Sequence, residues 1–425
     1  MRRLQFKMSL VAALMACAIG ASTGEDEHLS AVAAFERFAD LAVQLPPRIR
    51  TTDLSAYSTN KLDFALNNGL AISPGGRLWV SWISGGDGPH SFTAGNWSDD
   101  DGKTWTDVNL VIDGHDGTIT GRTNIIGTYW VDPAGRLHLF TDQSLLHFDG
   151  RAGVWESVCA NPDAPVPEWS APRRIADGHL LNKPVVASDG TWLASVYNNG
   201  TWTSFPSCVP GAFPHLQCKV WCYASVDHGK TWERRGVVEF PGRDWQETQL
   251  VELKNGALRV FARVHDETGR LMVADSRDGG RTWSAPFSLV SMDNTNARFQ
   301  VVRLASGRLL FVKHGPPAAG GKDGQGRSHL TAYLSEDDGT TWKGGLELDP
   351  GCGSYPDVCQ DSDGVIYVTH DHGRGKEAEI RLHKFTEEDV LARCIVSSRG
   401  RLNILVAKAM SSKFNQKAAG KMKSK

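Results

Sequence analysis

Four residues of this sequence carry reactive side chains in places where such side chains are unusual. Arg263 ends the alternating, strand-like run "GALRVFARV", where a guanidinium is costly to bury unless it serves a purpose. Tyr355 lies in a Gly/Pro loop, Arg327 follows a glycine-rich segment, and Asp87 stands in "SGGDGPHSF". An arginine fork binds carboxylates, a tyrosine beside a base can act as a nucleophile, and a carboxyl group can transfer protons. Whether these side chains can act together depends on the fold that positions them.

Each of these residues also has an ordinary structural explanation. Arg327 could be solvent-exposed beside its glycine-rich segment, and Asp87 could belong to a plain turn. A loop tyrosine such as Tyr355 can stack on a sugar instead of reacting with it. The glycine-rich "GGKDGQGR" follows no strand-to-phosphate-loop pattern, and no cofactor motif or clear metal site is evident. We therefore expect neither a cofactor nor a metal.

Two groups of cysteines stand out in the body of the chain. A zinc site in the first group is conceivable, but the spacing matches no common pattern, and a disulfide with one spare thiol is the alternative. Cys352 and Cys359 flank "GSYPDV", and a disulfide between them would pinch this loop. The first group comprises Cys208, His215, Cys218 and Cys222.

A repeated motif indicates which structural elements position these residues. The motif is Ser-x-Asp-x-Gly-x-Thr-Trp, and we call it the Asp box. It stands at 98–105, 225–232, 276–283 and 335–342. The aspartate is expected to accept backbone N–H groups of its own turn, the glycine to take a positive φ, and the tryptophan to pack between hairpins. Because the turn uses the carboxylate, we assign the box a structural role and not a catalytic one.

A second repeat shows that the boxes belong to a six-fold pattern. A turn followed by a period-two apolar run is typical of a hairpin, and recurrence at 40–60 residues indicates repeated blades. We therefore predict an all-β fold, a six-bladed β-propeller, with a decayed box at 148–155 and an outer strand of blade six contributed by the N-terminal segment near 48–58. The turn glycines are Gly76, Gly135, Gly190, Gly256, Gly307 and Gly364.

The flanks differ from the repeats. Residues 1–21 have the basic and apolar regions of a secretory signal, although "LMAC" could alternatively be a lipoprotein box that lipidates Cys17. We therefore expect a secreted, cell-surface or periplasmic protein. Residues 22–45 have helical spacing and predict a short helix docked beneath the ring. The basic segment 396–425 is expected to be a solvated tail, which leaves 46–395 for the propeller.

Composition narrows the choice of partners. The net charge of −2 gives no reason to expect nucleic acid as a partner. Outside the N-terminal segment no stretch approaches the 18 apolar residues or so of a transmembrane helix.

Asp boxes within a six-fold repeat resemble the sialidase (neuraminidase) superfamily, the BNR-repeat proteins, over about residues 60–390. "QETQLVELKNGALRVFAR" is similar to the sialidase segment that carries a base and a carboxylate-binding arginine, which implies these roles for Glu247 and Arg263. By the same resemblance Arg327, before the last box, is another carboxylate-binding arginine. Tyr355 in "GSYPDVCQDSDGVIYV" corresponds to the nucleophile. A neutral tyrosine suits a sugar whose anomeric carbon bears a carboxylate, because it avoids charge repulsion.

The chain also departs from the sialidase pattern and is more similar to a divergent branch of the superfamily. The first-blade segment "ALNNGLAISPGG" has Asn67 and Asn68 where sialidases have an arginine, so the first arginine is expected to be absent. Asp87 is the best-placed catalytic acid, with His90 as a rival. We expect Asn68 and His314 to contact substrate together with Arg263 and Arg327. Other residues of that branch that could face the pocket are Lys183, His370, Asp371 and His372.

The sequence thus predicts a secreted exo-glycosidase of sialidase type that hydrolyses a terminal acidic sugar of a glycan. The first alternative is a sialidase-fold lyase or hydrolase that acts on uronic-acid polysaccharide. The second is a propeller that binds glycans without catalysis.

Overall fold

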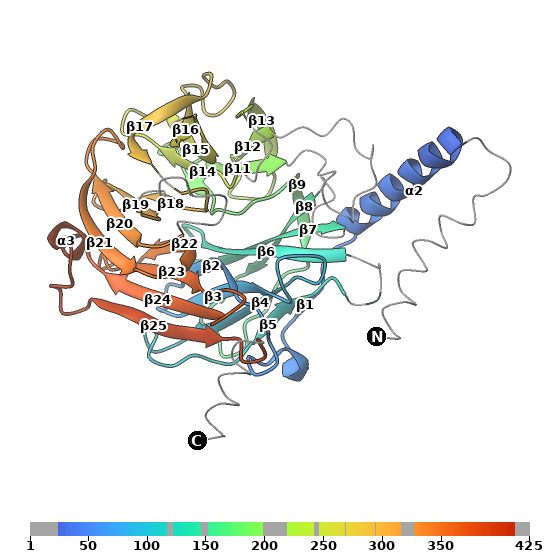
Figure 1. Cartoon of the computed structure of the whole chain (residues 1–425), viewed down its shortest axis with the longest axis horizontal. Helices are drawn as coiled ribbons and strands as arrows, with labels where there is room; N and C mark the ends of the chain where they lie inside the picture. The colour runs from blue at the N-terminus through green and yellow to red at the C-terminus, as the bar shows by residue number, and fades with distance from the viewer. Residues whose placement is uncertain are drawn as a thin grey trace.

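Six antiparallel sheets surround a common axis, one for each sequence repeat (Figure 1). Five sheets have four strands, and the first has a fifth strand at its outer edge. The predicted six-bladed β-propeller is confirmed. The structure is a computed structural model of the chain, and it describes residues 24–115, 117, 122–145, 152–198, 219–241, 246–267, 269–293, 295–315 and 327–412.

The strands of each blade follow one another in the chain from the axis outward. Blade one contains β2 (Leu66–Ile72), β3 (Leu78–Ser84), β4 (Phe92–Ser98), β5 (Leu110–Ile112) and the edge strand β1 (Ile49–Arg50). Blade two contains β6 (Arg122–Val131), β7 (Leu137–Leu145), β8 (Ala152–Cys159) and β9 (Arg173–Asp177), and blade three contains β10 (Val185–Val186), β11 (Trp192–Asn198), β12 (Lys219–Ser225) and β13 (Glu233–Val238). Blade four contains β14 (Gln249–Glu252), β15 (Leu258–His265), β16 (Arg270–Ser276) and β17 (Phe287–Asp293), and blade five contains β18 (Gln300–Arg303), β19 (Leu309–Lys313), β20 (Leu330–Ser335) and β21 (Lys343–Asp349). Blade six contains β22 (Gly353–Gln360), β23 (Ile366–His372), β24 (Glu379–Phe385) and β25 (Arg401–Lys408).

The hydrophobic core lies between neighbouring blades. Alternating apolar residues of one sheet pack against those of the next; for example, Leu310 and Val312 of β19 belong to one buried cluster with Val358 and Val368 of blade six. Such burial stabilises by about 25 cal/mol for each Å² of apolar area removed from water. The propeller therefore depends on contacts between blades that are adjacent in sequence, together with the contact that closes the ring.

The Asp boxes have the local structure that their sequence predicts. In the last box Asp337 accepts hydrogen bonds from the N–H of Thr341 at 2.8 Å and from its hydroxyl at 2.6 Å. The Gly339 N–H donates to Ser335 Oγ at 2.8 Å, and Trp342 packs on Phe311 with ring centroids 5.2 Å apart. Bonds from the threonine lower the pKa of the box aspartate to about 2. The carboxylate is thus used by its own turn, in agreement with a structural role.

The ring closes differently from the prediction. The outer strand of blade six is β25, which lies within the predicted C-terminal tail, and its edge is paired to β24. The N-terminal strand β1 instead pairs with β5, where Ile49 is opposite Ile112. The predicted closure by residues near 48–58 and the domain boundary at 395 are therefore wrong. The outer edge of the sixth sheet must be covered by another strand. Strand β25 covers it and buries the apolar side chains of Ile404 and Val406 on one of its faces.

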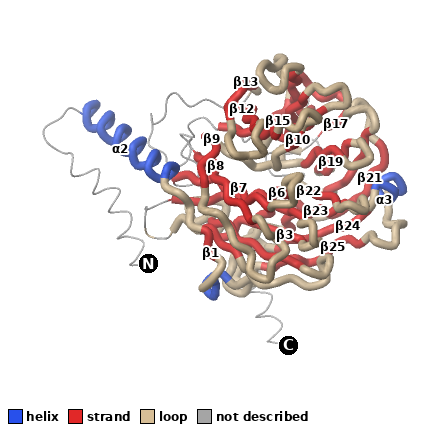
Figure 2. Tube along the Cα trace, turned by 180° about the vertical axis from the view of Figure 1, so that it is seen from behind, coloured by secondary structure: helices blue, strands red, loops and turns tan. Residues whose placement is uncertain are grey.

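The helices lie outside the ring (Figure 2). Helix α2 (Gly24–Gln44) projects from the side of the propeller next to β7 and does not lie beneath it. The short helix α3 (Glu387–Ala392) leads into β25, and a capping box at Thr386 begins it. Among the described residues, no helix is both long and apolar enough to span a membrane. The predicted signal at 1–21 lies outside the described residues, as does the first half of the predicted decayed box at 148–155.

A buried polar network fills the propeller axis. Arg298 has no exposed surface, and it donates to Asn182 Oδ1 at 2.8 Å and to the Asn68 carbonyl at 3.1 Å. Asp357 of β22 is also fully buried and lies 2.6 Å from Lys183 Nζ and 3.7 Å from Arg298 Nη2. This single carboxylate therefore compensates two cations from blades three and five.

We expect Asp357→Ala to destabilise the protein by about 3–5 kcal/mol, because removing one partner of a buried ion pair leaves the other charge unpaired. The substitution also removes the acceptor of the Leu70 N–H, at 2.6 Å. Urea unfolding of the purified variant measures the loss. Asp363→Ala is the matched control, because its ion pair with Arg399 is solvent-exposed and worth about 0–1 kcal/mol. Equal effects of the two substitutions would contradict a stabilising role for the axial network.

Candidate active site

Glu247, Tyr355 and Arg263 form a compact group at the end of the axis where the inner strands begin. The Tyr355 hydroxyl donates a hydrogen bond to Glu247 Oε1. Arg263 Nη1 is 2.8 Å from the same carboxylate oxygen and 3.4 Å from the Tyr355 oxygen. Glu247 is only 2% exposed. The phenol and the guanidinium therefore both contact one oxygen of the Glu247 carboxylate. A tyrosine that acts as a nucleophile requires such a base beside it.

Irregular backbone at these strand ends directs the side chains inward. Glu247 precedes β14 with φ 37°, and Tyr355 on β22 has φ 54°. Both values lie in the left-handed region, which costs a non-glycine residue of the order of 1–3 kcal/mol. The register of β22 shifts between Ser354 and Asp357, and that of β15 shifts just after Ala262. Such bulges redirect a side chain out of the regular alternation, and they are common beside active sites.

A third arginine, Arg374, completes the group and was not predicted. It lies in the turn between β23 and β24, and its guanidinium is 4.5 Å from the centre of the Tyr355 ring. Its Nε is 3.2 Å from Asp371 Oδ1, and its carbonyl accepts the Ala65 N–H of blade one at 2.9 Å. The first blade has no arginine here, as expected, but the expectation that this left the site short of an arginine is wrong. Blade six supplies the cation at its boundary with blade one.

Arg327 differs from the other two arginines in its contacts with described residues. It donates to the Asn296 carbonyl at 3.3 Å and lies with its guanidinium 5.8 Å from the centre of the Tyr355 ring. Within the described part of the chain it makes no ion pair, whereas Arg263 pairs with Glu247 and Arg374 with Asp371. Arg327 therefore offers the positive charge that an incoming anion can neutralise.

Burial and neighbouring charges shift the pKa values of Tyr355, Arg327 and Arg263. Burial raises the pKa of Tyr355 well above its ordinary value, and the charge of Glu247 raises it further. Burial lowers the pKa of Arg327, and the nearby charge of Arg374 adds to the effect. Burial alone would lower the pKa of Arg263, but Glu247 more than offsets this and the pKa is raised. Tyr355 is thus a neutral phenol in the free protein, and it requires a base to take its proton.

Asp87 lies at the rim of the group. Its side chain is half exposed, and Oδ2 is 3.8 Å from Arg374 Nη1. Its rival His90 faces the ring of His115 instead, at 5.9 Å between ring centroids. Asp87 thus contacts the arginine cluster and is exposed enough to meet a leaving group.

His314 and Asn68 lie beneath the group and not on its open side. Both are fully buried. His314 Nε2 is 3.0 Å from the Gly353 carbonyl, and burial lowers the pKa of its ring to about 3. The Asn68 carbonyl accepts from Arg298. The neighbouring Asn67 donates to the Tyr355 carbonyl at 2.8 Å. Asn68 stands at the bulge between Asn67 and Gly69 in β2, and His314 directly follows β19. The expected contacts of both residues with a substrate stay a prediction.

Of the two cysteine predictions, the structure tests the disulfide but describes only part of the other group. Cys352 and Cys359 are both free, so a disulfide between them is wrong. They stand at opposite ends of one extended strand, far beyond the roughly 7 Å limit between Cα atoms for a disulfide. Cys222 is free and buried, whereas the rest of the predicted 208–222 group lies outside the described residues.

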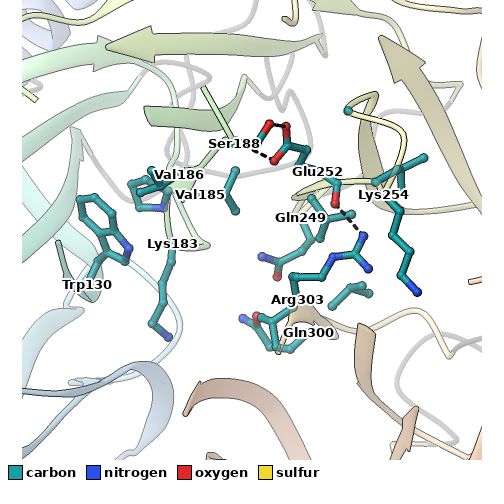
Figure 3. A pocket seen from close by; sticks show the side chains of 16 residues that line it. Trp130, Lys183, Val185, Val186, Ser188, Gln249, Glu252, Lys254, Gln300 and Arg303 are labelled. Carbon is teal, nitrogen blue, oxygen red and sulfur yellow. Dashed lines mark hydrogen bonds between the residues drawn. The ribbon is translucent and has the colours of Figure 1, made fainter. Parts of the chain in front are cut away.

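The opposite face carries a pocket of about 570 Å³ where β10, β14 and β18 end (Figure 3). Its charged groups are already engaged: Glu252 accepts from Ser188, Arg303 pairs with Asp338 at 2.7 Å, and Lys183 reaches Asp357. Nothing there resembles the tyrosine–glutamate pair, so the reactive group lies at the other end of the axis.

A six-bladed propeller whose strand ends gather a buried tyrosine–glutamate pair and three arginines defines the sialidase class of folds. The chain belongs to the BNR repeat-like domain family, whose model matches residues 65–368, and it is a BNR-repeat protein of the sialidase superfamily.

The curated relatives match only part of the chain. A sialidase of Vibrio cholerae is 30% identical over 174 residues, which are 34% of this chain and 22% of that protein. A sialidase of Micromonospora viridifaciens is 28% identical over 159 residues, covering 36% of this chain and 23% of the relative. The match therefore spans less than a quarter of either relative.

Solved sialidase structures share the fold. The intramolecular trans-sialidase from Ruminococcus gnavus superposes with a TM-score of 0.59 at 13% identity, covering 79% of this chain and 97% of that one. A Hadza microbial sialidase superposes with a TM-score of 0.56 at 18% identity, covering 72% and 63%. At these identities the similarity concerns the fold alone.

Proposed function

We propose that this protein is an exo-glycosidase of sialidase type that hydrolyses a terminal acidic sugar from a glycan. The observation that carries the proposal is the Tyr355–Glu247 hydrogen bond, with Arg263 on the same carboxylate. A carboxylate nucleophile would be repelled by a sugar that bears its own carboxylate on the anomeric carbon, whereas a neutral tyrosine is not.

The proposed reaction has two steps. Tyr355 attacks the anomeric carbon while Glu247 takes the phenol proton, and Asp87 protonates the oxygen of the leaving group. Water, deprotonated by Asp87, then displaces Tyr355 from the sugar, and Glu247 returns the proton to the phenolate. Two displacements at one carbon retain its configuration.

The arginines support an acidic substrate. Arg327 has the uncompensated charge, and Arg374 and Arg263 flank Tyr355, so a carboxylate on the anomeric carbon would meet guanidinium groups as the ring approaches the phenol. Guanidinium forks bind carboxylates in two-point, charge-assisted contacts. This proposal extends to action outside the cytoplasm, supported by the signal-like residues 1–21.

Release of free sugar from an α-linked sialoside tests the proposal, with proton NMR to follow the anomer formed first. We expect turnover with retention of configuration. Inverted product would exclude a covalent tyrosyl intermediate. If sialosides are inert, uronate-containing polysaccharide should be assayed next, because an ultraviolet-absorbing unsaturated product would identify the lyase alternative.

We expect Arg327→Lys to lower kcat/KM for a sialoside by about 10- to 150-fold, mainly through a higher KM. The lysine keeps a charge but loses the fork, which is worth about 1.5–3 kcal/mol with a charged partner. Steady-state kinetics measure the change. Arg308→Lys is the control, because Arg308 pairs with Glu336 and Glu387 on the surface. An unchanged KM in Arg327→Lys would remove Arg327 from the carboxylate site.

A further inference from the structure

Three potential metal ligands gather beside the candidate active site and take no part in the proposed reaction. Cys352, His372 and Glu377 each place one ligand atom within 4.8 Å of the others. We propose that these residues bind a zinc ion that ties together the two segments carrying Tyr355 and Arg374.

The backbone holds the three residues next to one another. Cys352 directly precedes Gly353, which pairs with His372 across β22 and β23. The Gly373 N–H donates to the Cys352 carbonyl at 3.4 Å. Glu377 lies in the turn between β23 and β24, which the Ala378 N–H closes on the Gly373 carbonyl at 2.9 Å. Sheet and turn hydrogen bonds thus fix the three attachment points before any metal is present.

His372 is already oriented as a ligand. Its Nδ1 is 2.6 Å from Oδ2 of Asp349, a carboxylate that is 1% exposed. Since an ionised carboxylate only accepts hydrogen bonds, a neutral His372 ring places its proton on Nδ1 and leaves the Nε2 lone pair for a metal. Metal-bound histidines in proteins commonly donate their other ring N–H to such a carboxylate, which fixes the tautomer and increases the basicity of the ligand.

The donor set and its charge suit zinc. Sulfur, nitrogen and oxygen ligands together favour zinc over calcium or magnesium, which take oxygen ligands. A thiolate and a carboxylate balance the charge of a divalent ion, and the neighbouring Arg374 is already paired with Asp371. Ligands around tetrahedral zinc lie roughly 3.5 Å apart, so the donors need to close by only about 1 Å. Cys352 is exposed, and its side chain can rotate to allow this.

A zinc ion bound at this position would affect the candidate active site. Arg374 stands between His372 and Glu377 in the turn, and its guanidinium lies over the Tyr355 ring at 4.5 Å. Cys352 directly precedes β22, the strand that carries Tyr355. A bound ion would therefore restrain Arg374 and Tyr355 relative to each other. Metal binding itself does not depend on the proposed glycosidase function.

Cobalt titration of the metal-free full-length protein tests the proposal. We expect one equivalent of Co²⁺ to produce a thiolate-to-cobalt charge-transfer band in the near ultraviolet, and Zn²⁺ to displace it. Cys352→Ser should abolish the band, and His372→Gln should weaken cobalt binding at least 10-fold. Cys394→Ser, at another exposed free cysteine, should leave the band unchanged.

Absence of the band in the wild-type protein would overturn the proposal. So would a band of undiminished strength in Cys352→Ser, because the cobalt would then be bound by another thiol. Circular dichroism of each variant excludes misfolding as the cause of a lost band. Sialoside turnover is measured separately, so that failure of the metal site and failure of the glycosidase proposal remain distinguishable.

Discussion

Tyr355→Phe is expected to lower kcat for an α-linked sialoside by at least about 10³-fold, because the reaction loses its nucleophile. Substrate affinity should change little, since the ring still lies beneath Arg374 and beside Arg327. The fold should also survive. The ion pair between Arg263 and Glu247 does not involve the phenol, so no buried charge loses its counterion.

The measurement compares steady-state turnover and equilibrium binding of a sialoside in the wild-type protein and the variant. Tyr333→Phe is the matched control, because it removes a partly buried phenol from β20, away from the reactive group. Retained turnover in Tyr355→Phe would assign Tyr355 to sugar stacking and would redirect the search for the nucleophile.

Glu247→Gln is expected to lower kcat by about 10²- to 10⁴-fold, because the phenol loses its general base. The amide keeps the shape of the side chain and an acceptor oxygen for Arg263. It removes the negative charge that helps to raise the pKa of Tyr355, so that this pKa should fall in the variant. Kinetics report the first effect, and ultraviolet titration of the phenol, with Tyr355→Phe as a blank, reports the second.

Glu252→Gln is the control for this substitution. Glu252 ends β14, the strand that Glu247 precedes, and it accepts from Ser188 at the opposite face of the propeller. If glycans bind without turnover and Glu247→Gln does not alter their affinity, the non-catalytic alternative would replace the glycosidase proposal.

The arginine cluster shows the limit of reading this site from the sequence. Glu247, Arg263, Arg327 and Tyr355 were recognisable because each stands within a local segment that resembles the superfamily. Arg374 was missed, because no local pattern relates the turn after β23 to the first blade. The one available signal was an arginine in "HDHGRG", next to residues already suspected of facing the pocket.

Ring closure explains the errors elsewhere. Asn67 contacts the Tyr355 carbonyl and the Asp371 carboxylate, although these residues are about 300 positions away along the chain. Strand β25 lies within the basic segment 396–425, so its composition predicts a tail and not a strand. Such pairings depend on which blades become neighbours when the ring closes, and periodicity within one blade carries no information about that.

The sequence by itself determined the blade count, the box turns and the order of the blades, because these depend on hydrogen bonds and apolar periodicity within some fifty residues. Only the tertiary structure decided which strand closes the ring, which cation lies over Tyr355, and which polar residues form the buried axial network. The physical reason is that packing of blade six against blade one joins the two ends of the repeat. Residues far apart in sequence then share a low-dielectric site, where each buried charge requires a partner.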